Sequence, residues 1–189
     1  MFSNTISSLS TSQDPEHMDE IMRTLLQKLN NNFNQIDGVL AWYNGAEAIP
    51  VCGIQGGEMY AIDSRGGSGY FNSASIVVKS NLDVSMQSIL MYTPGLENID
   101  DLSGLSLNVG LELGVETVGT AGYSYNLNNY ANDLAPHTIS AGFVVPMPGV
   151  PSLPIDGYID LNLTTKQNPI IREAKTDWNK WEFLRTDWY

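Results

Sequence analysis

The stretch LSLNVGLELGV, residues 105–115, decides the fold class of this chain. Leu or Val stands at every odd position, and Ser, Asn, Gly or Glu stands at every even one. Successive side chains of a β-strand point to opposite faces, so this alternation predicts a strand with one apolar and one polar face. We expect the apolar face to pack in a core and the polar face to meet water.

Similar but shorter runs lie on both sides of this strand. Glycine pairs and a Thr-Pro-Gly turn separate the runs before it, a proline-rich loop follows at 146–154, and residues 159–164 form the last clear run. Strands at such spacing are typical of antiparallel all-β domains. The sequence therefore predicts a mainly β fold, an antiparallel β-sandwich or jelly-roll-like domain over residues 45–165.

The alternation also suits the strands of an outer-membrane barrel. Two observations argue against that fold. Residues 1–13 carry neither the basic start nor the apolar run of a signal peptide, and few runs look long enough to cross a bilayer as strands. The chain also lacks the apolar run of about 18 residues that a membrane-spanning helix needs. We therefore expect no membrane insertion.

An amphipathic, coiled-coil-like helix is predicted over residues 14–43, behind an extended arm over residues 1–13. Asp14 is a good N-cap, and Pro15 suits the first helical position. Apolar residues then recur in steps of three and four, with one stutter. The stripe consists of Met18, Met22, Leu25, Leu29, Phe33, Ile36 and Leu40. It can pack on the chain's own β-domain or bundle with other copies, and its narrow width and its length favour bundling into a homo-oligomer.

The charge is acidic and unevenly distributed. The formal net charge is −12, and residues 80–165 contain no Lys or Arg. Because nucleic-acid affinity depends on Lys and Arg that neutralise phosphates, we expect no nucleic-acid binding. The acidic surface serves solubility, or it receives the mildly basic tail at 166–189. That tail carries five aromatic residues, which either close the domain's own core or dock on a partner: Trp178, Trp181, Phe183, Trp188 and Tyr189.

No group of residues has the spacing of a catalytic, cofactor or metal site. Cys52 lies in an apolar run and is expected to be a core cysteine, and the two histidines, His17 and His137, are far apart in the chain. The remaining acidic candidates suit the water-facing side of strands and loops and lack the regular oxygen spacing of a calcium loop: Asp100, Asp101, Glu112, Glu116, Asp156 and Asp160. We therefore predict that the chain is not an enzyme and has no cofactor.

The segment LLQKLNNNFNQI, residues 25–36, resembles the N-terminal part of tailed-bacteriophage fibres and other virion appendage proteins. In those proteins a Leu-Asn-x-Asn-Phe-Asn-x-Ile helix precedes β-structure rich in Gly, Ser and Asn. The resemblance implies a homotrimer with the helix at the threefold axis, and attachment of one terminus to a capsid or tail.

The short chain has no β-helical repeat, which favours a short fibre, a tail adaptor or a capsid decoration among the virion appendages. On this hypothesis the protein is made in the host cytoplasm, resides in the virion, and has copies of itself and other virion proteins as partners. The alternative is a receptor- or carbohydrate-binding β-module that recognises a host surface glycan. A secreted toxin domain is less favoured, because the sequence contains no catalytic triad or metal-ligand set.

Overall fold

The structure is a computed structural model, and it describes residues 15–32, 37–50, 52–79, 83–114, 118–127, 137–147 and 155–168. None of the helices in this part of the chain is long and apolar enough to cross a membrane. The elements, in chain order, are α2 (Pro15–Asn32), β1 (Gly38–Ile49), β2 (Cys52–Asp63), β3 (Ser68–Lys79), β4 (Asp83–Pro94), the 3₁₀ helix η1 (Ile99–Leu102), β5 (Gly104–Leu113), β6 (Val118–Asn126), β7 (His137–Pro146) and β8 (Ile155–Lys166).

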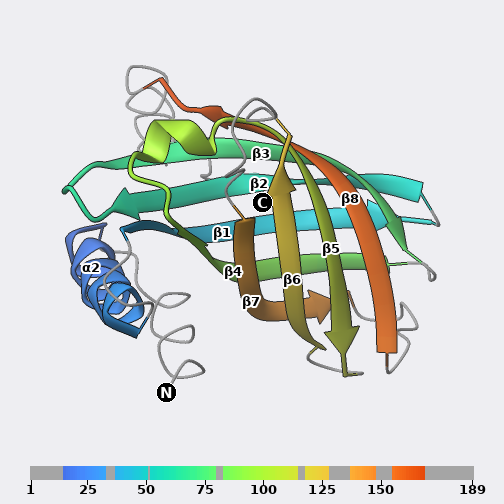
Figure 1. Cartoon of the computed structure of the whole chain (residues 1–189). Helices are drawn as coiled ribbons and strands as arrows, with labels where there is room; N and C mark the ends of the chain where they lie inside the picture. The colour runs from blue at the N-terminus through green and yellow to red at the C-terminus, as the bar shows by residue number, and fades with distance from the viewer. Residues whose placement is uncertain are drawn as a thin grey trace, which may run out of the picture.

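The strands form a closed barrel in which all neighbouring pairs are antiparallel (Figure 1). The order around the barrel is β1-β2-β3-β8-β5-β6-β7-β4, and β4 returns to pair with β1. The first four strands and the last four each have Greek-key order, because β4 lies beside β1 and β8 lies beside β5. In Figure 1, β5, β6 and β8 cross in front of β1–β4 at a steep angle.

The prediction of a sandwich or jelly roll was wrong. A sandwich keeps the edges of its two sheets separate, whereas here β3 pairs with β8 over nine residues and β4 pairs with β7 over eight. Hydrogen bonding across both junctions satisfies the backbone groups that edge strands would expose. Closure therefore removes every edge from the sheet.

The faces of the strands are also reversed relative to the prediction. Strand β5 is the alternating strand of residues 105–115, but its odd side chains point outward: Leu111 is 56% exposed, whereas Glu112 is 4% exposed inside the barrel. A period of two separates the faces of a strand without saying which face is enclosed. In β5 the polar face is inside the barrel.

The barrel has two unlike ends. The helix end carries α2, η1 and the turn at 64–67 (Figure 1). Apolar residues fill the interior at this end, where Leu96 and Ile99 of the β4–β5 connection pack among the inward side chains of four strands: Val39, Ala41, Tyr43, Met59, Ala61, Phe71 and Ile89. The opposite end, where β1, β3, β5 and β7 finish, is called the bare rim below.

Helix α2 packs on the outside of the barrel, across β1, β2 and β4. Met22, Leu25, Leu26 and Leu29 are buried against the outward side chains of Leu40, Trp42, Tyr60, Ile62, Leu90 and Tyr92. The contact is the first of the two arrangements that the sequence allows, packing on the chain's own β-domain. The structure ends the helix at Asn32 and begins β1 at Gly38, because the β-forming residues that follow pair with both β2 and β4.

Asp19 holds the helix to the wall through polar contacts. Its carboxylate accepts hydrogen bonds from the Tyr60 hydroxyl and from Arg23 Nε, the latter at 2.6 Å. Burial raises the pKa of Asp19, but the two hydrogen bonds and the Arg23 charge outweigh it, so the pKa lies below its ordinary value. The stabilisation that the Asp19 carboxylate gives to the docked helix is thus fully present above the ordinary aspartate pKa. It is lost as the pH falls through the lowered pKa of Asp19.

We expect Leu26→Ala to destabilise the protein by about 2–4 kcal/mol, because it leaves a cavity between α2 and the barrel wall. Gln27→Ala, on the exposed face of the same helix turn, is the matched control and should change stability by less than about 0.5 kcal/mol. Urea unfolding followed by circular dichroism measures both. Equal stability of the two variants would show that α2 is not docked.

Candidate functional site

The outer wall of the barrel is apolar from the bare rim to about half-way along β1, β2 and β4, where Asn44, Glu58 and Ser88 end it, and over most of β5 and β8. The large outward side chains of this region, called the apolar band, are between 41% and 70% exposed. They are Ile54, Ile76, Val78, Met86, Leu107, Val109, Leu111, Leu113, Tyr123, Ile139, Val145, Ile155, Ile159, Leu161 and Leu163. Members come from β2 through β8, and β1 adds the small exposed residues Ala46 and Ala48, so the band surrounds the barrel.

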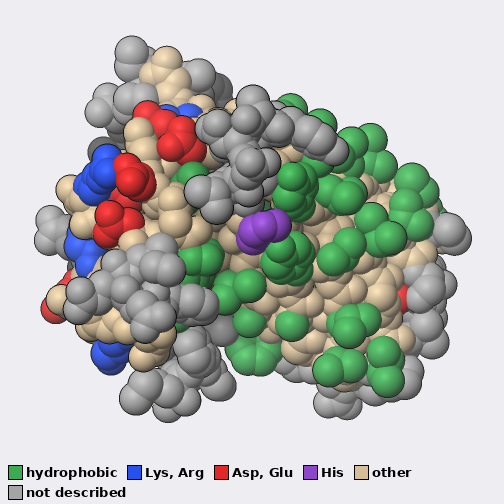
Figure 2. Space-filling view, viewed as in Figure 1, with side chains coloured by type: hydrophobic (Ala, Val, Ile, Leu, Met, Phe, Trp, Pro, Cys, Tyr) green, Lys and Arg blue, Asp and Glu red, His purple; other side chains and the backbone are tan. Residues whose placement is uncertain are grey.

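Among the described residues, charged side chains on the outer wall begin only where the band ends. Glu58, Asn72 and Thr165 are paired in register on β2, β3 and β8 and form a polar border toward the helix end. Figure 2 shows the same division: hydrophobic side chains spread over the barrel, and Lys, Arg, Asp and Glu gather around the helix end. The band is therefore a continuous apolar surface with a defined edge.

An aromatic group lies near the border on the other side of the barrel. The Tyr123 hydroxyl and His137 Nδ1 are hydrogen-bonded, and their rings are 5.3 Å apart between centroids. The Tyr125 ring lies 5.4 Å from the His137 ring. In Figure 2 the histidine lies among hydrophobic side chains on the side of the band that faces the helix end. Rings with one polar group suit a boundary between an apolar phase and water.

The interior between the apolar cluster and the bare rim is polar. Ser, Thr, Asn and Gln side chains line two cavities of about 30 Å³ and 60 Å³, which share Met91, Asn108 and Ser124 in their walls. Gln55 donates to Gln87 at 2.6 Å, and Asn108 donates to Asp160. Each cavity has room for one or a few water molecules, because about 10–15 Å³ suffices for one. Between the described residues, these two interior cavities are thus of water size.

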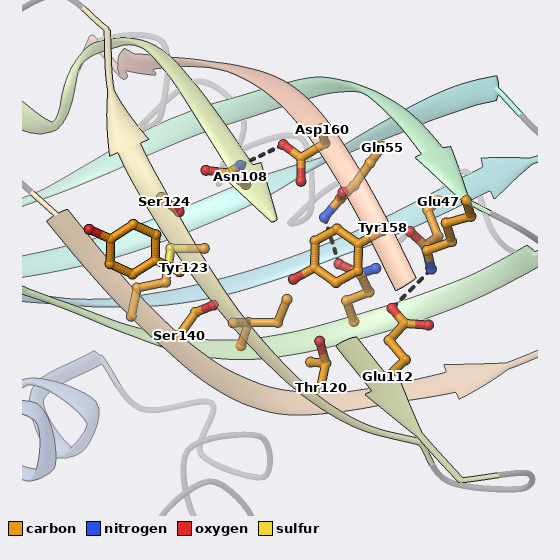
Figure 3. Close-up of a pocket in the computed structure, with 14 residues that line it drawn as sticks. Glu47, Gln55, Asn108, Glu112, Thr120, Tyr123, Ser124, Ser140, Tyr158 and Asp160 are labelled. Carbon is orange, nitrogen blue, oxygen red and sulfur yellow. Dashed lines mark hydrogen bonds and ion pairs between the residues drawn. The ribbon is translucent and has the colours of Figure 1, made fainter. Parts of the chain in front are cut away.

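A buried ion-pair network of Lys79, Glu47 and Glu112, called the crosspiece below, spans the interior near the bare rim (Figure 3). The Lys79 ammonium donates to Glu47 Oε1 at 2.5 Å and to Glu112 Oε1 at 2.9 Å, and Ser85 donates to the same Glu47 oxygen at 2.7 Å. Lys79 lies on β3, while its partners lie on β1 and β5, each two strands away around the barrel. The crosspiece therefore joins strands that share no backbone ladder.

Tyr158 completes the crosspiece, and glycines make room for it. Its ring centroid lies 5.8 Å from Lys79 Nζ. A Cβ at Gly110 would lie 2.3 Å from the Tyr158 ring, and a Cβ at Gly122 would lie 2.7 Å from its hydroxyl oxygen. Only glycine at these two positions leaves space for the ring.

The structure reverses two expectations for single residues. Glu112, Asp156 and Asp160 are buried inside the barrel, not on a water-facing side, because the polar faces of β5 and β8 point inward. Cys52 is exposed on the outer wall and is not a core cysteine. Ile54, two residues further along the same strand face, is also exposed on this wall.

The other candidate residues divide between the described part and the rest. Among the seam residues, Met22, Leu25, Leu29 and Leu40 meet at the α2–barrel contact, and Leu40 belongs to β1. The Met18 side chain, Phe33, Ile36, Glu116 and all five tail aromatics (Trp178, Trp181, Phe183, Trp188 and Tyr189) lie outside the described residues. Asp100 and Asp101 lie in η1, where Asp100 is paired with Lys166. Within the described residues, no three His, Cys, Asp or Glu side chains are placed to hold a metal ion.

Sequence reasoning missed the apolar band and the crosspiece. The signal for the band was the long absence of Lys and Arg, together with alternating strands whose polar positions are mostly Ser, Asn, Gly and Thr. The signal for the crosspiece was weaker, because Lys79 and its partners are far apart in the chain and only the barrel brings them together.

No family model, curated protein or solved structure matches this chain. The resemblance of residues 25–36 to virion appendage proteins stays a prediction.

Proposed function

We propose that the chain is a membrane-embedded β-barrel, with the apolar band in the hydrocarbon of a bilayer and the helix end in water. The observation that carries the proposal is the inversion of the barrel toward the bare rim, where large apolar side chains face outward and Glu47, Lys79 and Glu112 are enclosed. An exposed apolar patch of more than a few hundred Å² is rare on a soluble monomer and marks a partner or a membrane. A partner protein would cover one side of the barrel, whereas a bilayer covers an apolar band that surrounds it.

The dimensions of the barrel support a bilayer as the partner. The strands have nine to twelve residues, and about 9–11 residues cross a bilayer when tilted. A twelve-residue strand is about 36 Å long and rises about 27 Å along the axis at a tilt of roughly 40°. The expectation that long strands are too few was therefore wrong. The apolar band takes up most of this length on β8 and about half of it on β2, where it ends before Glu58. Closure also leaves no unpaired sheet edge in the hydrocarbon, where each exposed backbone group is costly.

The border residues support the same placement. Transmembrane barrels carry aromatic girdles at the membrane–water interfaces. The group of Tyr123, Tyr125 and His137 takes that position at the helix end of the band. Glu58, Asn72 and Thr165 form a polar border on β2, β3 and β8, so polar or aromatic residues limit the band on both sides of the barrel.

Flotation with lipid vesicles tests the proposal. Protein refolded with phosphatidylcholine vesicles should float with them in a density gradient and should stay with them after extraction at alkaline pH, which removes peripheral proteins. The band should also make the protein aggregate in buffer that contains neither lipid nor detergent. A protein that is monomeric in such buffer and sediments away from vesicles would overturn the proposal.

The virion hypothesis stays a prediction beside this one. It requires that α2 leave its place on the barrel before Met22, Leu25 and Leu29 can meet in a threefold seam. Light scattering in lipid-free buffer separates the two hypotheses. A discrete trimer that does not float would favour assembly between copies of the chain and would count against a bilayer.

A further inference from the structure

The two ends of the barrel differ sharply in charge. The segments that join strands at the bare rim are 50–51, 80–82, 114–117 and 147–154, and Glu116 is the only charged residue in their sequence. At the helix end, α2, the turn at 64–67 and η1 with its flanks carry charges of both signs, many of them exposed. Figure 2 shows the blue and red side chains together at that end.

A barrel enters a preformed bilayer by moving one of its ends through the hydrocarbon. Each Asp, Glu, Lys or Arg that crosses must be desolvated, which opposes insertion. Apart from the groups inside the barrel, the bare rim would carry two acidic residues across, Glu116 and Asp83 at the start of β4. The helix end would carry α2 across, whose outward face includes Glu20 and Lys28, along with the exposed Arg65–Glu97 pair.

The charged groups inside the barrel near the bare rim are shielded from lipid. Lys79 is 3% exposed, and Glu47, Glu112 and Asp156 are between 3% and 6% exposed, all of them inside the barrel wall. Once the barrel has closed, Lys79 pairs with Glu47 and Glu112 inside the wall, so these charges face one another and not the lipid. The bare rim therefore presents fewer charges to the hydrocarbon than the helix end does.

We propose that the barrel inserts with the bare rim first, so that this rim crosses the bilayer and the helix end stays on the side of addition. The orientation rests on the proposed function, because it needs a barrel that spans the bilayer. It goes beyond that function by fixing which part of the chain each side of the membrane meets. The surface of the side of addition would then carry α2, η1 and the charged turn at 64–67.

Two reporter cysteines test the orientation in a Cys52→Ser background, which removes the only natural thiol. Ser64→Cys lies in an exposed turn at the helix end, and Met147→Cys lies at the bare rim, where Met147 is 50% exposed. Each protein is added to preformed phosphatidylcholine vesicles and treated with a membrane-impermeant maleimide. Ser64→Cys should react almost completely, whereas Met147→Cys should react only after detergent opens the vesicles.

The possible failures are distinguishable. Half-labelling of both reporters in floating vesicles means random insertion, and labelling of Met147→Cys alone means the reverse orientation; either result overturns the inference and leaves the proposed function. Full labelling of both reporters in protein that does not float overturns the function and the orientation together.

A charge added at either end gives a second test that needs no thiol. Met147→Arg should slow insertion into vesicles by roughly tenfold or more, because the bare rim must then carry a cation across. Ser64→Arg is the matched control and should insert at the unchanged rate. Both variants alter exposed positions, so circular dichroism in detergent should show the same folded barrel. Equal insertion rates for the two would overturn the inference.

Discussion

Replacing Ile159 with Arg should strongly weaken membrane insertion, whereas Thr165→Arg on the same strand should leave it nearly intact. Both side chains are exposed on the outward face of β8, six residues apart. Ile159 lies in the middle of the apolar band, and Thr165 lies at the polar border. An Arg at the midplane of a bilayer costs about 2–4 kcal/mol in a barrel, and one near the interface costs about 0–1 kcal/mol.

The pair of variants controls for the added charge and for the length of the new side chain. The fraction that floats with phosphatidylcholine vesicles measures insertion, and urea unfolding of the inserted protein measures the energy difference. Secondary structure in detergent micelles should be the same for both variants, since each side chain points away from the interior. If Ile159→Arg inserted as well as Thr165→Arg, the band would not lie in hydrocarbon.

Lys79→Met should destabilise the barrel by about 3–5 kcal/mol, the other large effect that we expect. The substitution keeps the apolar stem and removes the ammonium that Glu47 and Glu112 share inside the barrel. Removing one partner of a buried ion pair leaves the opposite charge in a medium of low polarity, which is far more costly than the pair itself. Urea unfolding in detergent micelles measures the change.

Two further variants make this result specific. Lys166→Met removes an ammonium from the exposed Asp100 pair and should cost less than about 1 kcal/mol. The triple variant Lys79→Met/Glu47→Gln/Glu112→Gln should recover most of the lost stability, because no carboxylate of the crosspiece then remains without its cation. A Lys79→Met variant as stable as Lys166→Met would show that the crosspiece does not hold the barrel together.

The sequence by itself determined the strands and the main helix. Alternation over residues 105–115 reflects the two faces of β5, and Pro15 with the apolar residues that follow reflects one face of α2, because both patterns come from local backbone geometry. The helix end at Asn32 was not predicted. Leu40 continues the helical spacing, yet pairing with β2 and β4 places it in a strand.

Only the tertiary structure decided which face of each strand is enclosed. A strand such as β5 alternates in the same way whether its Leu and Val side chains fill a core or cover an outer wall. The alternation therefore does not tell which face of the strand is enclosed. Closure through the β3–β8 and β4–β7 ladders encloses the polar faces, and it brings Lys79 to Glu47 and Glu112 from distant parts of the chain. The apolar band is the outer consequence of the same closure, because side chains excluded from a narrow polar interior must lie outside.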